Sequence, residues 1–467
     1  MIFFPLNVFL QRYVIQGSLI SWLNIYIIRF SYTMIDPDFR FRFYTGNNYG
    51  LDTDCCTTIL DSDQRRLYYI TGPGTYFTEE EEAELLPIET FKRYFELLSP
   101  SVQSITVDGK GLLVSVSTDI PFEERGSGFL EYLYRPKLSS VVSLTDCPTI
   151  FHSRLTETDR LACGVDLMED TGNPKVKRVF KYDTTHNWRF LWNEMHILKS
   201  LPPHPNIVPL DALVLDEVDT RILGFTTRFV DGGDFKSNAT RPFKLKWLRQ
   251  LTDTLDFLHL EMGIVHGDMQ PKNILVNPDT GNLQLFDFGM AGEISDTRIH
   301  VEIQEVAWVL YEIITHDTAL REERFQGAGS DASMILNMSG WPVRAKLTCK
   351  ATRLRKHLDD WIKRRTKALP VIPTKHIDID WNPLYEPSSS PATEAFFDSL
   401  WPWLERNDPD WREDGEPPGS PSNVPETKPT RHAFQWRRLP YYEAYPDRRP
   451  DTKDLEEDQR RKRRRIS

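Results

Sequence analysis

Cysteine is scarce in this 467-residue sequence, and none of the five cysteines belongs to a C-x-x-C pair or a His/Cys cluster. This scarcity argues against a disulfide scaffold and a structural zinc site. An excess of positive charge is also lacking, since the formal net charge is −11. The chain therefore has no overall basic field that would attract nucleic acid. We expect reduced thiols, a cytoplasmic or nuclear location, and no nucleic-acid partner.

A clear secretory signal peptide is lacking as well, because residues 1–30 show neither a basic start nor a small-residue cleavage site. These residues are strongly apolar, but the stretch between Arg12 and Arg29 is shorter than the roughly 20 residues of a spanning helix. We interpret residues 1–33 as an apolar leader or a mis-assigned start ahead of Met34. A membrane anchor and a buried helix remain alternatives, and a membrane partner is not expected.

Residues 34–146 are predicted to form an N-terminal α+β region. Phe39–Phe43 alternates apolar and polar residues, as a half-buried strand does. Thr78–Leu98 has an acidic start and apolar residues at helical spacing, and short strands flank the turn signal Asp108–Gly111. No residues here have catalytic spacing, so this region is interpreted as structural or docking.

Residues 384–467 form a C-terminal region rich in proline, serine and charge. Asp408–Thr430 has the composition of a flexible segment. Arg460–Arg465 is an uninterrupted run of basic residues. Such a run is either a solvated tail or a nuclear import signal.

Between these regions, residues 147–383 contain the residues that carry chemistry. Asp268 and Asn273 lie in a polar loop between two apolar stretches, and a further apolar strand ends in Asp287-Phe288-Gly289. Phosphoryl transfer requires a carboxylate to orient the accepting hydroxyl and oxygen ligands for Mg²⁺. These two carboxylates and one amide can supply both, so the pattern predicts a phosphotransferase.

In order and spacing these residues resemble the catalytic loop and metal motif of the eukaryotic protein kinase superfamily. In the residues that flank these motifs, the region resembles a group of largely uncharacterised fungal kinase-like proteins. The resemblance implies an α+β, bilobal protein-kinase-like fold, with a small β-rich N-lobe and a mainly helical C-lobe behind the N-terminal extension. It implies Asp268 as catalytic base, Asn273 and Asp287 as Mg²⁺ ligands, and ATP as phosphate donor.

Upstream, Phe190–Leu201 and the turn Pro202–Val208 resemble the kinase regulatory helix and the segment that follows it. The resemblance makes Glu194 the partner of the ATP-binding strand lysine. Long helical stretches, such as Arg344–Lys367, are expected beyond the catalytic motifs.

Two lysines on the predicted strand Val176–Tyr182 compete for that role. Lys181 has Val179 two residues before it, where family members place a small apolar residue under adenine. Lys177 has a lysine at the equivalent position. We therefore favour Lys181 and keep Lys177 as the alternative.

Gly224–Phe235 resembles the last N-lobe strand and the hinge. By that resemblance Thr227 is the gatekeeper, and the backbone from Arg228 to Val230 meets adenine. Asp234 then matches the acidic position that holds the ribose hydroxyls.

Several features of the superfamily are missing. No G-x-G-x-x-G precedes the lysine strand, and Gly267 replaces the arginine before the catalytic Asp. Gln270 stands where a lysine usually neutralises the γ-phosphate, so Lys272 is expected to take that part. The interval from Asp287 to Glu302 is roughly half that of peptide-phosphorylating kinases, and no A-P-E follows.

The missing glycine-rich loop removes part of the backbone cradle for the phosphates, whereas the short interval and the missing A-P-E concern the acceptor and not ATP. We expect transfer to a serine or threonine hydroxyl of an unidentified protein. A small-molecule acceptor and an inactive kinase-like scaffold that binds a partner remain alternatives.

Overall fold

The computed structural model describes residues 35, 40–47, 54–77, 85–95, 98–99, 101–118, 135–183, 189–217, 220–321, 331–375, 441–445 and 447. The predictions for residues 1–33, 408–430 and 460–465 lie outside these ranges. Within them, no helix combines the length and apolar character needed to cross a membrane.

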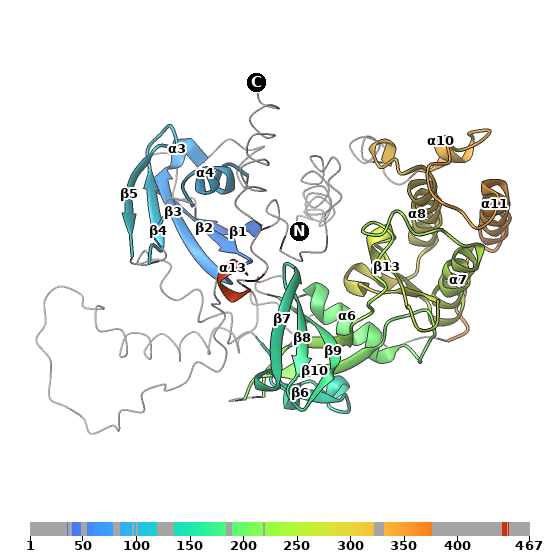
Figure 1. Cartoon of the computed structure of the whole chain (residues 1–467), viewed down its shortest axis with the longest axis horizontal. Coiled ribbons are helices and arrows are strands. Elements are labelled where there is room, and N and C mark those ends of the chain that lie inside the picture. Colours follow the sequence, from blue (N-terminus) through green and yellow to red (C-terminus); the bar gives the residue numbers. More distant parts are fainter. Residues whose placement is uncertain are drawn as a thin grey trace, which may run out of the picture. The chain divides into compact units, whose positions relative to one another are not determined.

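Residues 40–118, which we call the N-terminal module, contain a five-stranded sheet in the order β1-β2-β3-β4-β5 (Figure 1). The pairs are antiparallel except for β3 with β4. The elements are β1 (Phe41–Asn47), β2 (Asp54–Asp61), β3 (Arg66–Pro73), α3 (Gly74–Phe77), α4 (Leu85–Phe95), β4 (Ser104–Val107) and β5 (Leu113–Ser117).

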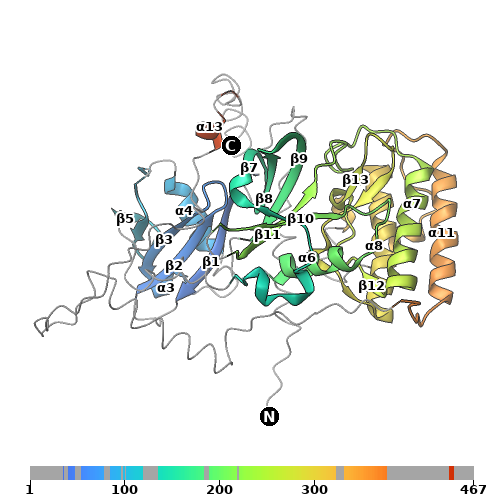
Figure 2. The same ribbon diagram turned by 90° about the horizontal axis from the view of Figure 1, so that it is seen from below.

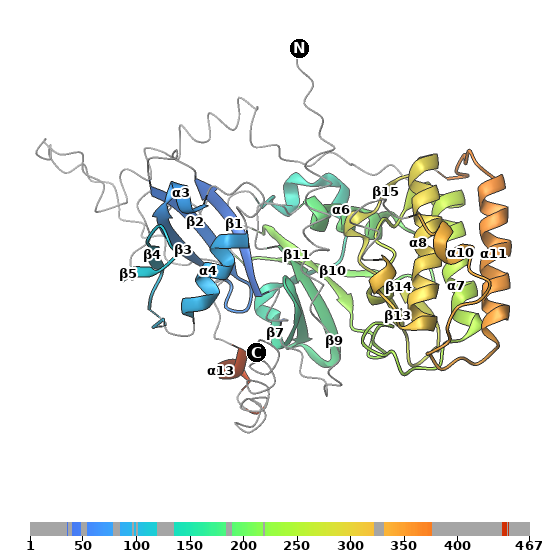
Figure 3. The same ribbon diagram turned by 90° about the horizontal axis from the view of Figure 1, so that it is seen from above.

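Helix α4 lies against the sheet of this module (Figure 3). The ring of Phe91 on α4 is 5.4 Å from that of Phe41 and 4.8 Å from that of Tyr68. Ile59 and Ile70 are buried in the same cluster. This aromatic and aliphatic core explains why the alternating strand pattern predicted at residues 39–43 is present at β1.

The second sheet is the N-lobe of the predicted kinase-like domain, in the order β6-β10-β11-β9-β8-β7. All its pairs are antiparallel except β6 with β10. The segment from Arg135 already contacts this sheet, because its Nη1 donates to Leu223 O at 2.8 Å. The elements are η3 (Leu138–Ser140), η4 (Val142–Leu144), β6 (Thr149–Phe151), η5 (His152–Arg154), β7 (Leu155–Ala162), β8 (Val165–Asp170), β9 (Asn173–Tyr182), α6 (Arg189–Ser200), β10 (Leu210–Leu215) and β11 (Ile222–Arg228).

The C-lobe is mainly helical, and α7, α8 and α11 run side by side in it (Figure 2). Short strands and turns carry the catalytic motifs between α7 and α8. The elements are α7 (Leu245–Asp256), the π-helix η6 (Phe257–Met262), β12 (Ile264–Val265), η7 (Pro271–Asn273), β13 (Ile274–Val276), β14 (Leu283–Leu285), η8 (Phe288–Met290), β15 (Gly292–Glu293), α8 (Asp296–Thr315), α10 (Ser333–Leu336) and α11 (Ala351–Lys367). A short helix, α13 (Tyr441–Ala444), follows near the C-terminus.

One helix boundary differs from the prediction. The helix expected from Arg344 begins at Ala351, because the segment before it is bound to Phe243, whose N–H donates to Lys346 O at 2.8 Å and whose carbonyl accepts from Thr348 N at 3.0 Å. Helix α8 begins at Asp296, and Ser295 caps it because its Oγ accepts from Arg298 N at 3.2 Å. The predicted bilobal α+β fold is confirmed.

Candidate active site

The strand lysine, the helix glutamate and the second aspartate meet at one point. Lys181 Nζ on β9 lies 2.8 and 3.0 Å from the two carboxylate oxygens of Glu194 on α6. It also lies 3.0 Å from Asp287 Oδ1, at the end of the strand that leads into Phe288. One ammonium thus connects the N-lobe strand, the regulatory helix and the metal motif of the C-lobe.

The charges in this cluster shift one another's pKa values. Burial alone would lower the pKa of Lys181, but the carboxylates of Asp287 and Glu194 outweigh it and raise that pKa above its ordinary value. In turn, Lys181 holds the pKa of Asp287 below its usual range. Lys181 is therefore a fixed positive charge and Asp287 a fixed negative one at neutral pH.

The alternative lysine lies elsewhere. Lys177 is exposed, and its backbone carbonyl accepts from Phe229 N at 3.1 Å, at the start of the hinge. Lys181 instead pairs across the sheet with Val165 on β8. Val179 pairs with Leu167, so apolar residues flank the lysine on the same face.

In the catalytic loop, Asp268 has a partner on each carboxylate oxygen. Gln270 Nε2 donates to Oδ1, and Asn273 Nδ2 donates to Oδ2 at 2.8 Å. Lys272 Nζ lies 3.7 Å from Oδ2, with 47% of its side chain exposed. The loop therefore brings Asp268, Asn273 and Lys272 together, and Gln270 orients the aspartate from the other side.

Gly267 is required by the backbone geometry of this loop. Its φ is +80°, and a Cβ there would lie 2.4 Å from the carbonyl oxygen of Met290. Any side chain would meet that backbone atom, and an L-residue is strained at this φ. The arginine that the superfamily places here cannot fit this backbone, which the sequence alone did not reveal.

Helix α8 supports the loop from behind. Glu302 Oε1 accepts from Gly267 N at 2.7 Å, and its Oε2 lies 2.5 Å from His259 Nε2 on the π-helix. Arg365 Nη2 lies 3.0 Å from His259 Nδ1. Because an arginine can only donate, Nδ1 accepts and Nε2 carries the proton given to Glu302. Glu302 thus connects the catalytic loop to the π-helix and buttresses it.

Three further residues near the loop were missed by sequence reasoning. Glu305 accepts a hydrogen bond from the backbone N–H of Met269, and Arg321 Nη2 donates to Met269 O at 3.1 Å. Arg298 donates to the carbonyls of Met290 and Glu293 at 3.2 and 3.1 Å. Their only sequence signal was a place on or after α8, which does not distinguish them from ordinary helix charges.

Arg298 closes a very short segment between the metal motif and α8. Strand β15 follows η8 almost at once and pairs with β12, which directly precedes the catalytic loop. The guanidinium of Arg298 then binds the carbonyl of Met290, ahead of β15, and that of Glu293, at the end of β15. The short interval between Asp287 and Glu302 is therefore a compact connection that is held in place by hydrogen bonds to its backbone, and we call it the anchored connection.

The hinge residues follow β11 into the C-lobe. Thr227 is buried opposite Val179, whereas 74% of the Arg228 side chain is exposed. Phe229 N donates to Lys177 O on β9 at 3.1 Å, so this amide is already used within the N-lobe sheet. Asp234 caps the next turn, where its Oδ1 accepts from Ser237 N at 2.7 Å.

Asn273 and Asp287 are suited to hold a magnesium ion together with nucleotide phosphates. Asn273 uses Nδ2 on both the backbone O and Oδ2 of Asp268, at 2.8 Å each, which turns its Oδ1 away from that residue. One oxygen of Asp287 binds Lys181, and 41% of the Asp287 side chain is exposed. No group of three His, Cys, Asp or Glu in the described ranges forms a metal cage. Mg²⁺ commonly binds one or two carboxylates and completes its shell with phosphates and water.

Comparison with known proteins agrees with this site. Residues 169–325 match the family model described as protein kinase domain. The chain is 33% identical over 105 residues to casein kinase II subunit alpha' of Saccharomyces cerevisiae, covering 22% of this chain and 30% of that protein. It is 32% identical over 130 residues to CBL-interacting protein kinase 5 of Oryza sativa subsp. japonica, covering 26% and 27%.

A third relative is serine/threonine-protein kinase WNK8 of Arabidopsis thaliana, at 34% identity over 107 residues, covering 22% of this chain and 19% of that protein. The chain thus spans less than a third of the length of each of these curated relatives. The matched residues contain Lys181, Glu194, Asp268, Asn273 and Asp287. Residues 169–325, which carry this site, thus match a protein kinase domain, and the bilobal fold around them agrees with that match.

Proposed function

We propose that this domain binds Mg-ATP and transfers the γ-phosphate to a serine or threonine hydroxyl of a protein. The contact of Lys181 with both Glu194 and Asp287 carries this proposal, because it assembles groups from three separate elements. Such an assembly has a clear use in holding nucleotide phosphates.

Each residue has a defined part in the proposed reaction. Lys181 binds the phosphates and is held by Glu194. Asp268 orients the acceptor hydroxyl and takes its proton as the new phosphate ester bond forms, while the bond from the γ-phosphorus to the bridging oxygen breaks and ADP leaves. Lys272, beside Asp268 and half exposed, is placed to neutralise charge on the transferred group. When bound at Asn273 and Asp287, magnesium would screen the phosphate charge.

A protein acceptor is supported by the relatives, one of which is named a serine/threonine-protein kinase. The resemblance to fungal kinase-like proteins is part of the same proposal and implies no particular substrate. A small-molecule acceptor is the second candidate. The anchored connection between η8 and α8 favours it, because this connection leaves little chain to build a platform for a peptide.

Incubation of the purified chain with labelled ATP and Mg²⁺ tests the proposal. The panel of acceptors includes a serine/threonine peptide library and a set of hydroxylated metabolites. We expect labelled peptide from wild type and at least a hundredfold less from Asp268→Ala. If wild type and Asp268→Ala release phosphate equally slowly, the proposed enzymatic activity is refuted and a non-catalytic scaffold is favoured. Labelling of metabolites without peptides replaces the protein acceptor by the small molecule.

A further inference from the structure

The β7–β8 hairpin occupies the place of the missing glycine-rich loop. Ala162 pairs with Val165, so the turn consists of Cys163 and Gly164 alone. Val165 in turn pairs with Lys181, which puts the turn beside the proposed phosphate site. The short turn has little chain of its own with which to cover a nucleotide.

The N-terminal module contacts the tip of this hairpin. Ser62, in the turn between β2 and β3, has its Oγ 3.0 Å from Cys163 Sγ. Arg42 on β1 donates from Nη1 to the same sulfur at 3.4 Å. Residues about a hundred positions apart thus meet at the two-residue turn.

Arg65 extends these contacts along the hairpin. Its guanidinium forms an ion pair with Asp166 on β8, and Nε donates to the hydroxyl of Tyr182 at 2.9 Å. The same group lies 4.5 Å from the centre of the Tyr182 ring. Arg65 is 7% exposed and Asp166 is fully buried. The backbone of Arg65 has φ of +50°, a strained conformation that the surroundings must maintain.

Arg160 on β7 makes the reciprocal contact from the kinase domain. Its Nη1 donates to the carboxylate and the carbonyl of Asp63 at 2.7 and 3.0 Å. Its Nε donates to Glu157 at 2.8 Å, and the residue is 1% exposed. Each partner therefore places a buried arginine on a carboxylate of the other.

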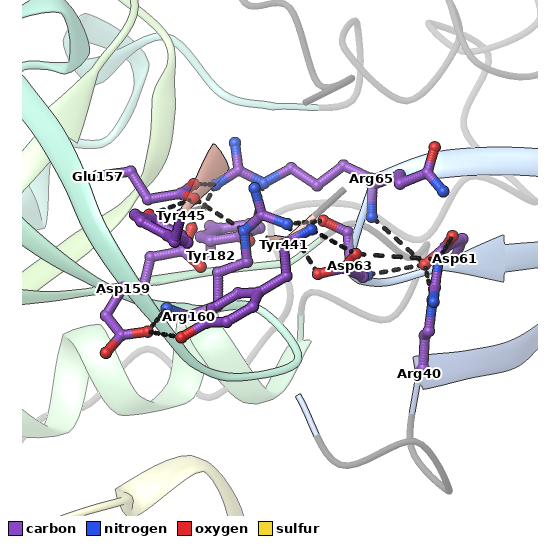
Figure 4. A network of polar contacts seen from close by, with 12 residues as sticks. Arg40, Asp61, Asp63, Arg65, Glu157, Asp159, Arg160, Tyr182, Tyr441 and Tyr445 are labelled. Atoms are coloured by element: carbon purple, nitrogen blue, oxygen red, sulfur yellow. Dashed lines mark hydrogen bonds and ion pairs between the residues drawn. The ribbon is translucent and has the colours of Figure 1, made fainter. Parts of the chain in front are cut away.

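The segment around α13 joins the same network (Figure 4). Tyr441 N donates to Asp63 Oδ2 at 3.1 Å, and its hydroxyl donates to Asp159 at 3.1 Å. Tyr445 donates from its hydroxyl to Glu157 at 2.9 Å. Three parts of the chain, far apart in sequence, thus share one set of buried charges.

Buried ion pairs of this kind add little net stability, because desolvation offsets the attraction. Breaking one partner is costly, however, since it leaves a charge buried without its counterpart. Such a network can therefore select a single docked geometry. In this chain that geometry fixes the position of the β7–β8 hairpin.

We propose that Arg65 and Arg160 are positioning residues that clamp the N-terminal module and the α13 segment onto the β7–β8 hairpin, and that this clamp sets nucleotide affinity. The inference rests on the proposed binding of Mg-ATP. Through Val165 and β9, the clamp holds the short turn against the strand that carries Lys181. The N-terminal module thus holds this short turn in place. A glycine-rich loop, which covers the phosphates with its own backbone, does not need such support.

The test compares the full-length chain with Arg65→Met and Tyr445→Phe. Arg154→Met is the matched control, because Arg154 pairs with Asp170 on the same hairpin at 2.7 Å and is half exposed. One readout is the rate at which a thiol reagent modifies Cys163, resolved by mass spectrometry without nucleotide. Cys349 is the internal reference. The second readout is the dissociation constant of Mg-ATP, from calorimetric titration.

We expect Arg65→Met to speed the modification of Cys163 and to weaken Mg-ATP binding by about five- to tenfold, the lower range of coupling between sites. Tyr445→Phe, which removes one hydroxyl, should change both in the same direction by less. Arg154→Met should change neither.

Unchanged modification of Cys163 in both clamp variants overturns the inference. Faster modification with unchanged affinity also overturns it, because the clamp then does not act on the site. If Arg65→Met fails to fold, Tyr445→Phe decides in its place. A wild-type chain that binds no nucleotide refutes the proposed function and with it the effect on affinity, while the Cys163 rates still show whether the clamp exists.

Discussion

At the scale of single residues, Lys181 and Lys177 differ in surroundings more than in sequence. Both lie on the same face of one strand, yet only Lys181 reaches Glu194 and Asp287. A cation that is already held by two carboxylates is preorganised for phosphate.

Lys181→Met should therefore abolish most of the stabilisation of the fold by Mg-ATP, whereas Lys177→Met should preserve it. Thermal unfolding with and without Mg-ATP measures this difference. The reverse result would assign the strand lysine to Lys177 and leave the fold unaffected.

Gly267 is the second residue whose replacement has a specific consequence. Alanine at its φ of +80° costs about 1–2 kcal/mol in backbone strain. The close approach of Met290 O adds to that cost. Gly281→Ala is a matched control, since Gly281 has φ of +64° and a Cβ added there would meet no atom within 4 Å. Urea unfolding should show the larger loss of stability for Gly267→Ala. Equal losses would show that the contact with Met290 is unimportant.

At the scale of elements, α8 connects the catalytic loop to the interior of the C-lobe. Burial raises the pKa of Glu305 to about 8 from an ordinary 4.5. The folded protein therefore keeps a proton that the unfolded chain releases above about pH 4.5. The stability contributed by this group is present at low pH and is lost as pH rises to about 8, by at most about 1.4 kcal/mol per pH unit.

Glu305→Gln should remove this dependence, because glutamine stays neutral and its carbonyl can still accept from Met269 N. Urea unfolding at pH 5, 6, 7 and 8 compares the two proteins. The stability of the variant relative to wild type should increase steadily over that range. Parallel curves would place the pKa of Glu305 near its ordinary value.

The sequence allowed the catalytic loop to be predicted because phosphoryl transfer restricts residue types at fixed spacing. Asp268, Asn273 and Asp287 could be found in that way. The need for glycine at position 267 could not, since it depends on how closely Met290 approaches. The pairing of Arg65 with Asp166 was equally hidden, because neither residue belongs to a local pattern.

At the scale of the whole molecule, the proposed ligand should stabilise the chain by mass action. Mg-ATP at about a hundred times its dissociation constant adds about 2.7 kcal/mol to the free energy of unfolding. For a chain of this size the melting temperature should rise by a few degrees.

This rise should disappear when EDTA removes the magnesium, and it should persist in Asp268→Ala, whose carboxylate serves the acceptor. Differential scanning calorimetry of the full-length chain measures both. A melting temperature that does not respond to Mg-ATP would identify a kinase fold that does not bind the nucleotide.

The anchored connection between η8 and α8 also restricts which synthetic inhibitors this domain can accept. The Phe288 ring is fully buried and lies 4.7 Å from that of His266. Only a few residues separate it from β15, which is paired with β12 and tied by Arg298. Drug-like compounds that require this ring to swing out would have to break that pairing. Screening should therefore select compounds that leave the Phe288 ring in place, and chemical libraries built to displace it should yield few hits.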